Sequence, residues 1–106
     1  VASVGVTEAE ARAAGHDVVS SLRHYGATAY GWALEDTTSF CKVVADRRTR
    51  QLLGAHIIGT EASLLIQQLV QGMEFGLTVY QMARNQMYIH PALSEVVEQA
   101  LLDLPA

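Results

Sequence analysis

Cysteine is almost absent from this chain of 106 residues, in which Cys41 is the only one. A single thiol can neither close a disulfide within the chain nor form a cysteine-based structural zinc site, so neither device stabilises this domain. So few cysteines are typical of a reducing compartment, and we therefore expect a cytoplasmic protein. Cys41 follows Phe40 in an apolar stretch, which indicates a buried structural thiol rather than a reactive one.

Long apolar runs and basic stripes are also missing. No apolar run approaches the roughly 20 residues that a membrane-spanning helix needs. The charge balance is mildly acidic, with 7 basic and 11 acidic residues and a formal net charge of −4. We therefore expect neither a nucleic acid nor a membrane as a partner.

The apolar content bounds the domain organisation. Half of the residues are apolar, which is enough for one hydrophobic core in a chain of this length. We therefore expect one domain over residues 1–106. The sequence begins at Val1, without methionine and in the middle of an alternating pattern, and we expect the domain to be a fragment of a longer protein.

Residue spacing predicts a mixture of strands and helices. Strands are expected over 1–5, 17–25, 30–34, 40–46 and 51–59. Helices are expected over 7–14, 61–75, 78–84 and 93–104. Two of the helices start with the sequence of a capping box, and the strands on either side of the charged turn at 47–50 are expected to form a β-hairpin. This order predicts an α+β fold, an antiparallel sheet with helices packed on it.

The helix expected over 61–75 is apolar on more than one side. Leu64 and Phe75 lie off its main apolar stripe. Because a helix with two apolar sides packs against two surfaces, and a domain of this size has little second surface of its own, we expect this helix to contribute to an interface between subunits.

The most informative candidate site combines His90, Pro91 and Glu95. A histidine changes its protonation state near neutral pH, and a carboxylate can fix its tautomer and stabilise its cation. Proline restrains the backbone and can adopt a cis peptide bond. Glu95 lies opposite the apolar stripe of the last helix, so we expect it to face away from the core. The residues alone leave two interpretations open: a surface ion pair, or half of an acid/base device whose nucleophile belongs to another chain.

The other histidines and the methionines indicate packing rather than chemistry. His56 lies within an apolar strand and is expected in the core or at an interface. His16 and His24 have no metal-ligand spacing, so no metal site is expected.

Four stretches in order along the chain resemble the C-terminal dimerisation domain of the pyridine nucleotide-disulfide oxidoreductases, which are flavoprotein disulfide reductases. They are residues 4–11, the hairpin 40–44 with 52–59, the helix that begins Glu61-Ala62, and His90-Pro91 with Glu95.

This resemblance implies a role for each residue of the candidate site. In the full-length enzyme other domains would bind FAD and NADPH, and a cysteine pair there would reduce a small-molecule disulfide. This domain would close a homodimer and carry His90 to the partner subunit's active site as the acid/base. Glu95 would orient His90 and stabilise its imidazolium. The His90-Pro91 bond would be cis, with its backbone near the partner's FAD. The fragment alone would bind no cofactor and be inactive.

Within the family, His90-Pro91-Ala92-Leu93 and the helix after it are most similar to the mycothione reductase subfamily. This similarity implies reduction of mycothiol disulfide with NADPH, a reaction of thiol redox homeostasis. The dihydrolipoamide dehydrogenase subfamily is one alternative. A non-catalytic interaction module is another.

Overall fold

One antiparallel sheet organises the computed structural model, which describes residues 1–106. Its four strands lie in the order β1-β4-β3-β2. The strands are β1 (Ala2–Gly5), β2 (Val18–His24), β3 (Phe40–Asp46) and β4 (Leu52–Ile58). The helices are α1 (Glu8–Ala13), α2 (Ala29–Ala33), α3 (Ala62–Glu74), α4 (Val79–Arg84) and α5 (Ser94–Leu102), with a 3₁₀ turn over Tyr25–Ala27. The predicted α+β fold and its central hairpin β3–β4 are confirmed.

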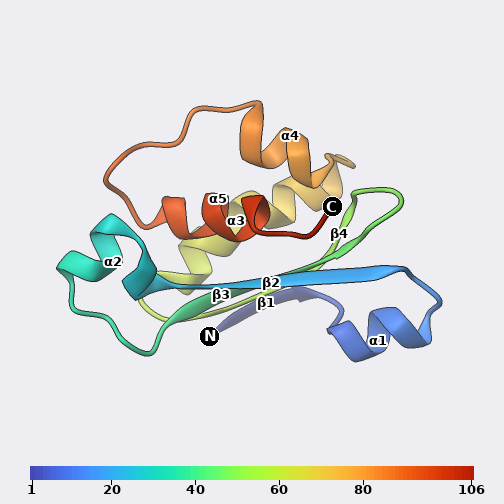
Figure 1. Cartoon of the computed structure of the whole chain (residues 1–106), viewed down its shortest axis with the longest axis horizontal. Coiled ribbons are helices and arrows are strands. Elements are labelled where there is room, and N and C mark those ends of the chain that lie inside the picture. The colour runs from blue at the N-terminus through green and yellow to red at the C-terminus, as the bar shows by residue number, and fades with distance from the viewer.

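Helices lie on both faces of the sheet. Figure 1 shows α3, α4 and α5 on one face of the sheet and α1 on the opposite face. Helix α3 packs on β4 and β1, while α5 packs on β2 and β3, and α4 contacts α5. The core therefore lies between the sheet and the pair α3 and α5.

Helix α5 has its place because its apolar stripe matches the covered face of the sheet. Val96, Val97 and Ala100 are fully buried, and Leu101 is 3% exposed. They belong to the same core cluster as alternate residues of β3, among them Cys41 and Val43. Burial of each Val or Leu side chain contributes about 1.5–3 kcal/mol, so this stripe is a main anchor of the C-terminal segment.

Both predicted capping boxes are present. Thr7 and Glu10 close the start of α1, and Thr78 and Gln81 close the start of α4, each pair exchanging side-chain and backbone hydrogen bonds. These local bonds satisfy amides that would otherwise lack partners at the helix ends.

The strand predicted over 30–34 was wrong, because this segment forms helix α2. The Thr28 hydroxyl accepts a hydrogen bond from the Gly31 amide at 3.3 Å, and it donates one to the Tyr25 carbonyl at 2.7 Å. Gly31 approaches that carbonyl so closely that a Cβ there would lie 1.9 Å from the oxygen. The buried Thr28 cap and this close approach override the strand-like alternation of apolar residues.

Asp46 closes the turn of the β3–β4 hairpin. Its carboxylate accepts hydrogen bonds from the amides of Arg48 and Thr49 at 2.8 and 3.3 Å. It also pairs with Nδ1 of His16 at 2.8 Å, a contact across 30 residues that the sequence did not predict. The hydrogen bond from His16 and those of the turn amides lower the pKa of Asp46 below its ordinary 3.8.

A prediction for the sheet concerns Gly54, which is buried in β4. A Cβ there would lie 2.0 Å from the carbonyl oxygen of Val6, which is backbone. We expect Gly54→Ala to lower the free energy of unfolding by about 1–3 kcal/mol, because the backbone has to shift. Gly72→Ala is the control: its Cβ would lie 2.2 Å from the Met82 sulfur, the end of a flexible side chain. Urea unfolding should show a smaller loss at Gly72, and equal losses would contradict the steric explanation.

A second prediction concerns acid stability. Because folding lowers the pKa of Asp46, the unfolded chain binds the proton more readily, and the stabilisation is present above pH 3.8 and lost as the pH falls through the native pKa. We expect wild-type protein to be more stable than Asp46→Asn at neutral pH, with a gap that narrows below pH 3.8. The difference in stability is measured from the urea unfolding midpoints of both proteins at several pH values. A gap that stays constant would show that Asp46 acts without its charge.

Candidate acid–base site

The structure brings His90, Pro91 and Glu95 together between α4 and α5. His90 and Pro91 end the loop that follows α4, and their peptide bond is cis, as expected. Glu95 lies in the first turn of α5. Nδ1 of His90 lies 2.7 Å from Oε1 and 2.9 Å from Oε2 of Glu95.

Glu95 is held on both sides by the core and by the backbone. Leu93 is 6% exposed and Val96 is fully buried, so the start of α5 is fixed to the core. The amide of Ala92 donates to Oε1 of Glu95 at 3.3 Å. The carboxylate is therefore held by the Ala92 amide as well as by His90.

The prediction that Glu95 faces away from the core needs a correction. Glu95 lies off the apolar stripe, but its side chain is only 13% exposed, whereas that of His90 is 68% exposed. The reason is that the carboxylate folds back onto the His90-Pro91 turn instead of extending into solvent. The outward-facing member of the pair is the imidazole.

This arrangement defines the chemistry available to His90. An ionised carboxylate only accepts hydrogen bonds, so Nδ1 carries a proton and donates a hydrogen bond to Glu95. Nε2 has no hydrogen-bond partner within the chain, and in the neutral ring it presents a lone pair. The ring can therefore take a proton at Nε2 from a group outside this domain, and Glu95 then stabilises the resulting cation.

The chain supplies no nucleophile to this pair. Cys41 is fully buried in β3, and burial raises the pKa of its thiol to about 12. The thiolate is the reactive form of cysteine, so the prediction of a structural thiol is confirmed.

The remaining histidines are structural. His56 joins β4 to the N-terminal strand, with Nδ1 3.1 Å from the Ser3 hydroxyl and Nε2 3.1 Å from the Val6 carbonyl. His24 packs edge-on against Phe40, with ring centroids 6.1 Å apart. No group of three or more His, Cys, Asp or Glu side chains in the structure could hold a metal ion.

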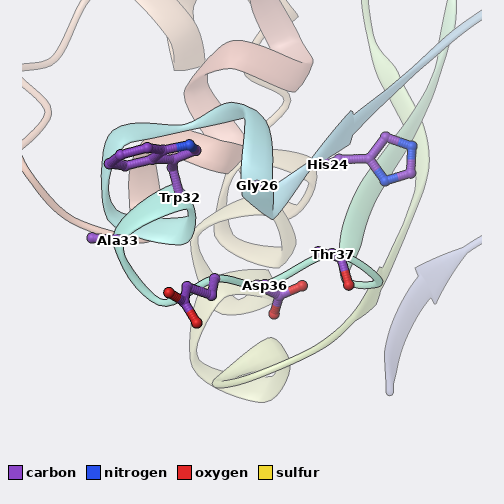
Figure 2. Close-up of a pocket in the computed structure, with 7 residues that line it drawn as sticks. His24, Gly26, Trp32, Ala33, Asp36 and Thr37 are labelled. Atoms are coloured by element: carbon purple, nitrogen blue, oxygen red, sulfur yellow. The ribbon is translucent and has the colours of Figure 1, made fainter.

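A hollow of about 540 Å³ lies beside α2 and the loop after it, with Trp32 and His24 on opposite sides (Figure 2). The sequence did not predict it. Its carboxylate Asp36 accepts hydrogen bonds from the Ser39 amide at 2.8 Å, the Ser39 hydroxyl at 2.7 Å and the Thr38 amide at 3.1 Å. These bonds, the Ser39 amide first, lower the pKa of Asp36. Asp36 thus belongs to the turn before β3, and Glu35 is the second carboxylate that lines the hollow.

The sequence also did not predict the contacts of two residues in the loop before His90. Gln86 and Tyr88 both donate hydrogen bonds to the carbonyl of Met82 in α4, at 2.8 and 3.0 Å. Nothing in the residue spacing indicated this pair, because its acceptor is a backbone atom.

The second apolar side of α3 is exposed, as its sequence indicated. Leu64 and Phe75 are 70% and 72% exposed, and Tyr80 of α4 is 63% exposed. The groove between α3 and α4 is lined by Phe75 and Leu77 together with glutamine side chains. This surface has the mixed composition of an interface between subunits.

Comparison with known proteins gives the family. The dimerisation-domain model of the pyridine nucleotide-disulphide oxidoreductases matches residues 1–101. This chain belongs to that family. It is 55% identical to mycothione reductase of Mycobacterium tuberculosis (strain ATCC 25618 / H37Rv) over 98% of its own length and 23% of that protein. It is 38% identical to dihydrolipoyl dehydrogenase of Mycobacterium leprae over 93% of its length and 21% of that protein.

Solved structures agree with this assignment. The HOCl-induced flavoprotein disulfide reductase RclA from Escherichia coli superposes with a TM-score of 0.86 at 27% identity, over 95% of this chain and 23% of that one. LpdA from Mycobacterium tuberculosis gives a TM-score of 0.85 at 22% identity, over 94% of this chain and 22% of that one, and shows the shared fold. The chain thus spans about a quarter of the length of the relatives that it matches. Every helix, including α3 with 13 residues, falls short of what a membrane span requires.

A prediction for this site concerns the tautomer of His90. At a pH where the ring is neutral, we expect Nδ1 to carry the proton in the wild-type chain, because Glu95 accepts it. In Glu95→Gln the acceptor charge is gone, and the ring should shift towards a mixture of both tautomers. Nitrogen-15 NMR of the imidazole distinguishes the two forms. The matched control is Glu98→Gln, one turn further along α5, which should leave the tautomer unchanged; a shift there as well would contradict a specific role for Glu95.

Proposed function

We propose that this chain is the dimerisation domain of an FAD- and NADPH-dependent disulfide reductase that reduces mycothiol disulfide in thiol redox homeostasis. The 55% identity to mycothione reductase, against 38% for the dihydrolipoyl dehydrogenase, supports this substrate. The proposal for the chemistry itself depends on one observation. His90 is held by Glu95 at Nδ1 and exposes a free Nε2, while the chain has no nucleophile for that atom to serve.

His90 would move protons for thiols of the partner subunit. Its neutral Nε2 takes a proton from the attacking thiol, which then reacts with the disulfide as a thiolate. The imidazolium returns a proton to the departing sulfur, whose negative charge it neutralises. Glu95 stays ionised throughout and stabilises the cation without receiving its proton. FAD and NADPH supply the electrons when they are bound to the full-length enzyme.

This chain is suited to contact a flavin that other domains bind, and not to bind the flavin itself. It contains no glycine-rich dinucleotide-binding loop, so the phosphates of FAD or NADPH need other domains. His90 and Pro91 are both exposed, and their backbone is free to lie near the FAD of the partner subunit. The isolated domain should therefore bind no cofactor and have no reductase activity.

The partner subunit is proposed to be a second copy of the same protein. The exposed side of α3, with Leu64 and Phe75, supports this homodimer. We place the enzyme in the cytoplasm, where a reducing environment keeps Cys41 as a thiol. A small-molecule disulfide is the proposed substrate, and neither nucleic acid nor membrane is a proposed partner.

Dihydrolipoamide dehydrogenase activity is the second candidate, favoured by the 38% identity over 93% of the chain. The two activities differ in substrate, so turnover of the full-length enzyme on mycothiol disulfide and on lipoamide decides between them. A clear preference for lipoamide would overturn the first assignment.

The catalytic role of His90 is tested in the full-length enzyme. We expect His90→Gln to lower disulfide turnover by about 10²–10⁴-fold, the range of a lost general acid/base, without loss of bound flavin. Stopped-flow reduction of the flavin by NADPH should be unaffected, because that step needs no proton from His90. His16→Gln is the control, since His16 pairs with Asp46 instead. Unchanged turnover in His90→Gln would leave the chain as a non-catalytic interaction module.

The action across subunits has its own test in mixed dimers. One subunit carries His90→Gln and the other lacks its redox-active cysteines. If His90 serves the partner, such dimers keep one complete site and recover up to half of the wild-type turnover. Equal inactivity of mixed and singly mutated dimers would contradict action across the interface.

A further inference from the structure

The loop between α4 and His90 is tied to one backbone atom. The carbonyl oxygen of Met82 accepts a hydrogen bond from Nε2 of Gln86 at 2.8 Å and one from the hydroxyl of Tyr88 at 3.0 Å. Nε2 of Gln86 also lies 3.3 Å from the Tyr88 hydroxyl, which closes a three-membered network. This carbonyl belongs to the last turn of α4, where backbone acceptors need partners from outside the helix.

The Met82 carbonyl, which accepts both hydrogen bonds, belongs to a residue that is packed into the core. Met82 is 3% exposed, and its sulfur fills the space beside Gly72 of α3, where a Cβ would approach it to 2.2 Å. Helix α4 in turn contacts α5. The network therefore attaches the loop to helix α4, which is itself packed against α3 and α5.

Tyr88 is the one side chain of the loop before His90 that is turned towards the domain. It is half-buried, whereas Met87 and Ile89 are 85% and 63% exposed, and the His90 side chain is 68% exposed. Tyr88 therefore attaches the loop to the domain two residues before His90. Glu95 holds the ring from the other end of the turn.

We propose that Tyr88 and Gln86 are positioning residues for His90: together they fix the loop to the Met82 carbonyl, so that Nε2 of His90 is presented to the partner subunit in one orientation. This inference rests on the proposed function of His90. Neither residue touches the reacting atoms.

Neither hydrogen-bond donor of the network changes its protonation state at the pH at which an enzyme works. Burial raises the pKa of the Tyr88 hydroxyl to about 12, so it stays a neutral donor across the pH range of an enzyme. An amide such as that of Gln86 does not titrate. The two donors therefore keep their protons while His90 gains and loses one, and their hydrogen bonds to Met82 persist.

The test uses full-length enzyme with Tyr88→Phe, which removes the hydroxyl and keeps the buried ring. We expect kcat to fall about five-fold, the rate equivalent of one neutral hydrogen bond, while KM stays within about two-fold. Tyr30→Phe is the matched control, because Tyr30 of α2 is 40% exposed and its hydroxyl makes no hydrogen bond within the chain. Gln86→Met removes the second donor at similar length and should have an effect of the same kind even if Tyr88→Phe folds poorly.

A double-mutant cycle separates positioning from general stability. In a His90→Gln background, Tyr88→Phe should cause no further loss, because the residue that it positions is gone. Hydrogen exchange of the full-length protein should be faster over residues 85–93 in Tyr88→Phe and unchanged in Tyr30→Phe.

The outcomes are distinguishable. If His90→Gln keeps full turnover, the proposed function fails whatever Tyr88 does. If His90→Gln is impaired but Tyr88→Phe matches Tyr30→Phe in both kcat and exchange, the proposed function stands and the positioning role is overturned. An equal loss from Tyr88→Phe in both backgrounds would show a purely structural effect and would also overturn it.

Discussion

The burial of α5 on the sheet is the interaction on which the candidate site depends. Val96, Val97 and Ala100 are fully buried over β2 and β3, and the Ser21 hydroxyl of β2 donates to the Ala100 carbonyl. Because Glu95 lies in the first turn of this helix, its position follows from the packing of the residues that come after it, Val96, Val97 and Ala100. The exposed imidazole of His90 thus gains its orientation, through Glu95, from the buried apolar residues of α5.

The site combines a carboxylate that the domain holds in place with an imidazole that has no reaction partner in the same chain. Glu95 is nearly buried and held by the Ala92 amide, whereas His90 extends from the surface with Nε2 free. An exposed imidazole with no nucleophile beside it in its own domain is what the proposed shared active site would require. The family assignment gives this arrangement a context, since a dimerisation domain places surface groups of one subunit against another.

Local sequence signals were accurate where the interactions are local. The capping boxes at Thr7 and Thr78 each need two side chains three residues apart, and both formed. The apolar stretches of β3 and β4 on either side of a charged turn predicted their hairpin. At residues 30–34 a short apolar stretch was wrongly assigned to a strand, because the buried hydroxyl of Thr28 caps a helix there, and burial cannot be read from spacing.

The sequence by itself determined the pattern of the site: a histidine and proline before an amphipathic helix whose first turn has a carboxylate. Only the tertiary structure decided that the carboxylate folds inward and the imidazole points outward, that His16 binds Asp46, and that Gln86 and Tyr88 share the Met82 carbonyl. The physical reason is the same in each case. Periodicity reports which face of an element is apolar, whereas a hydrogen bond to a distant side chain or a backbone atom forms only once packing has placed both partners.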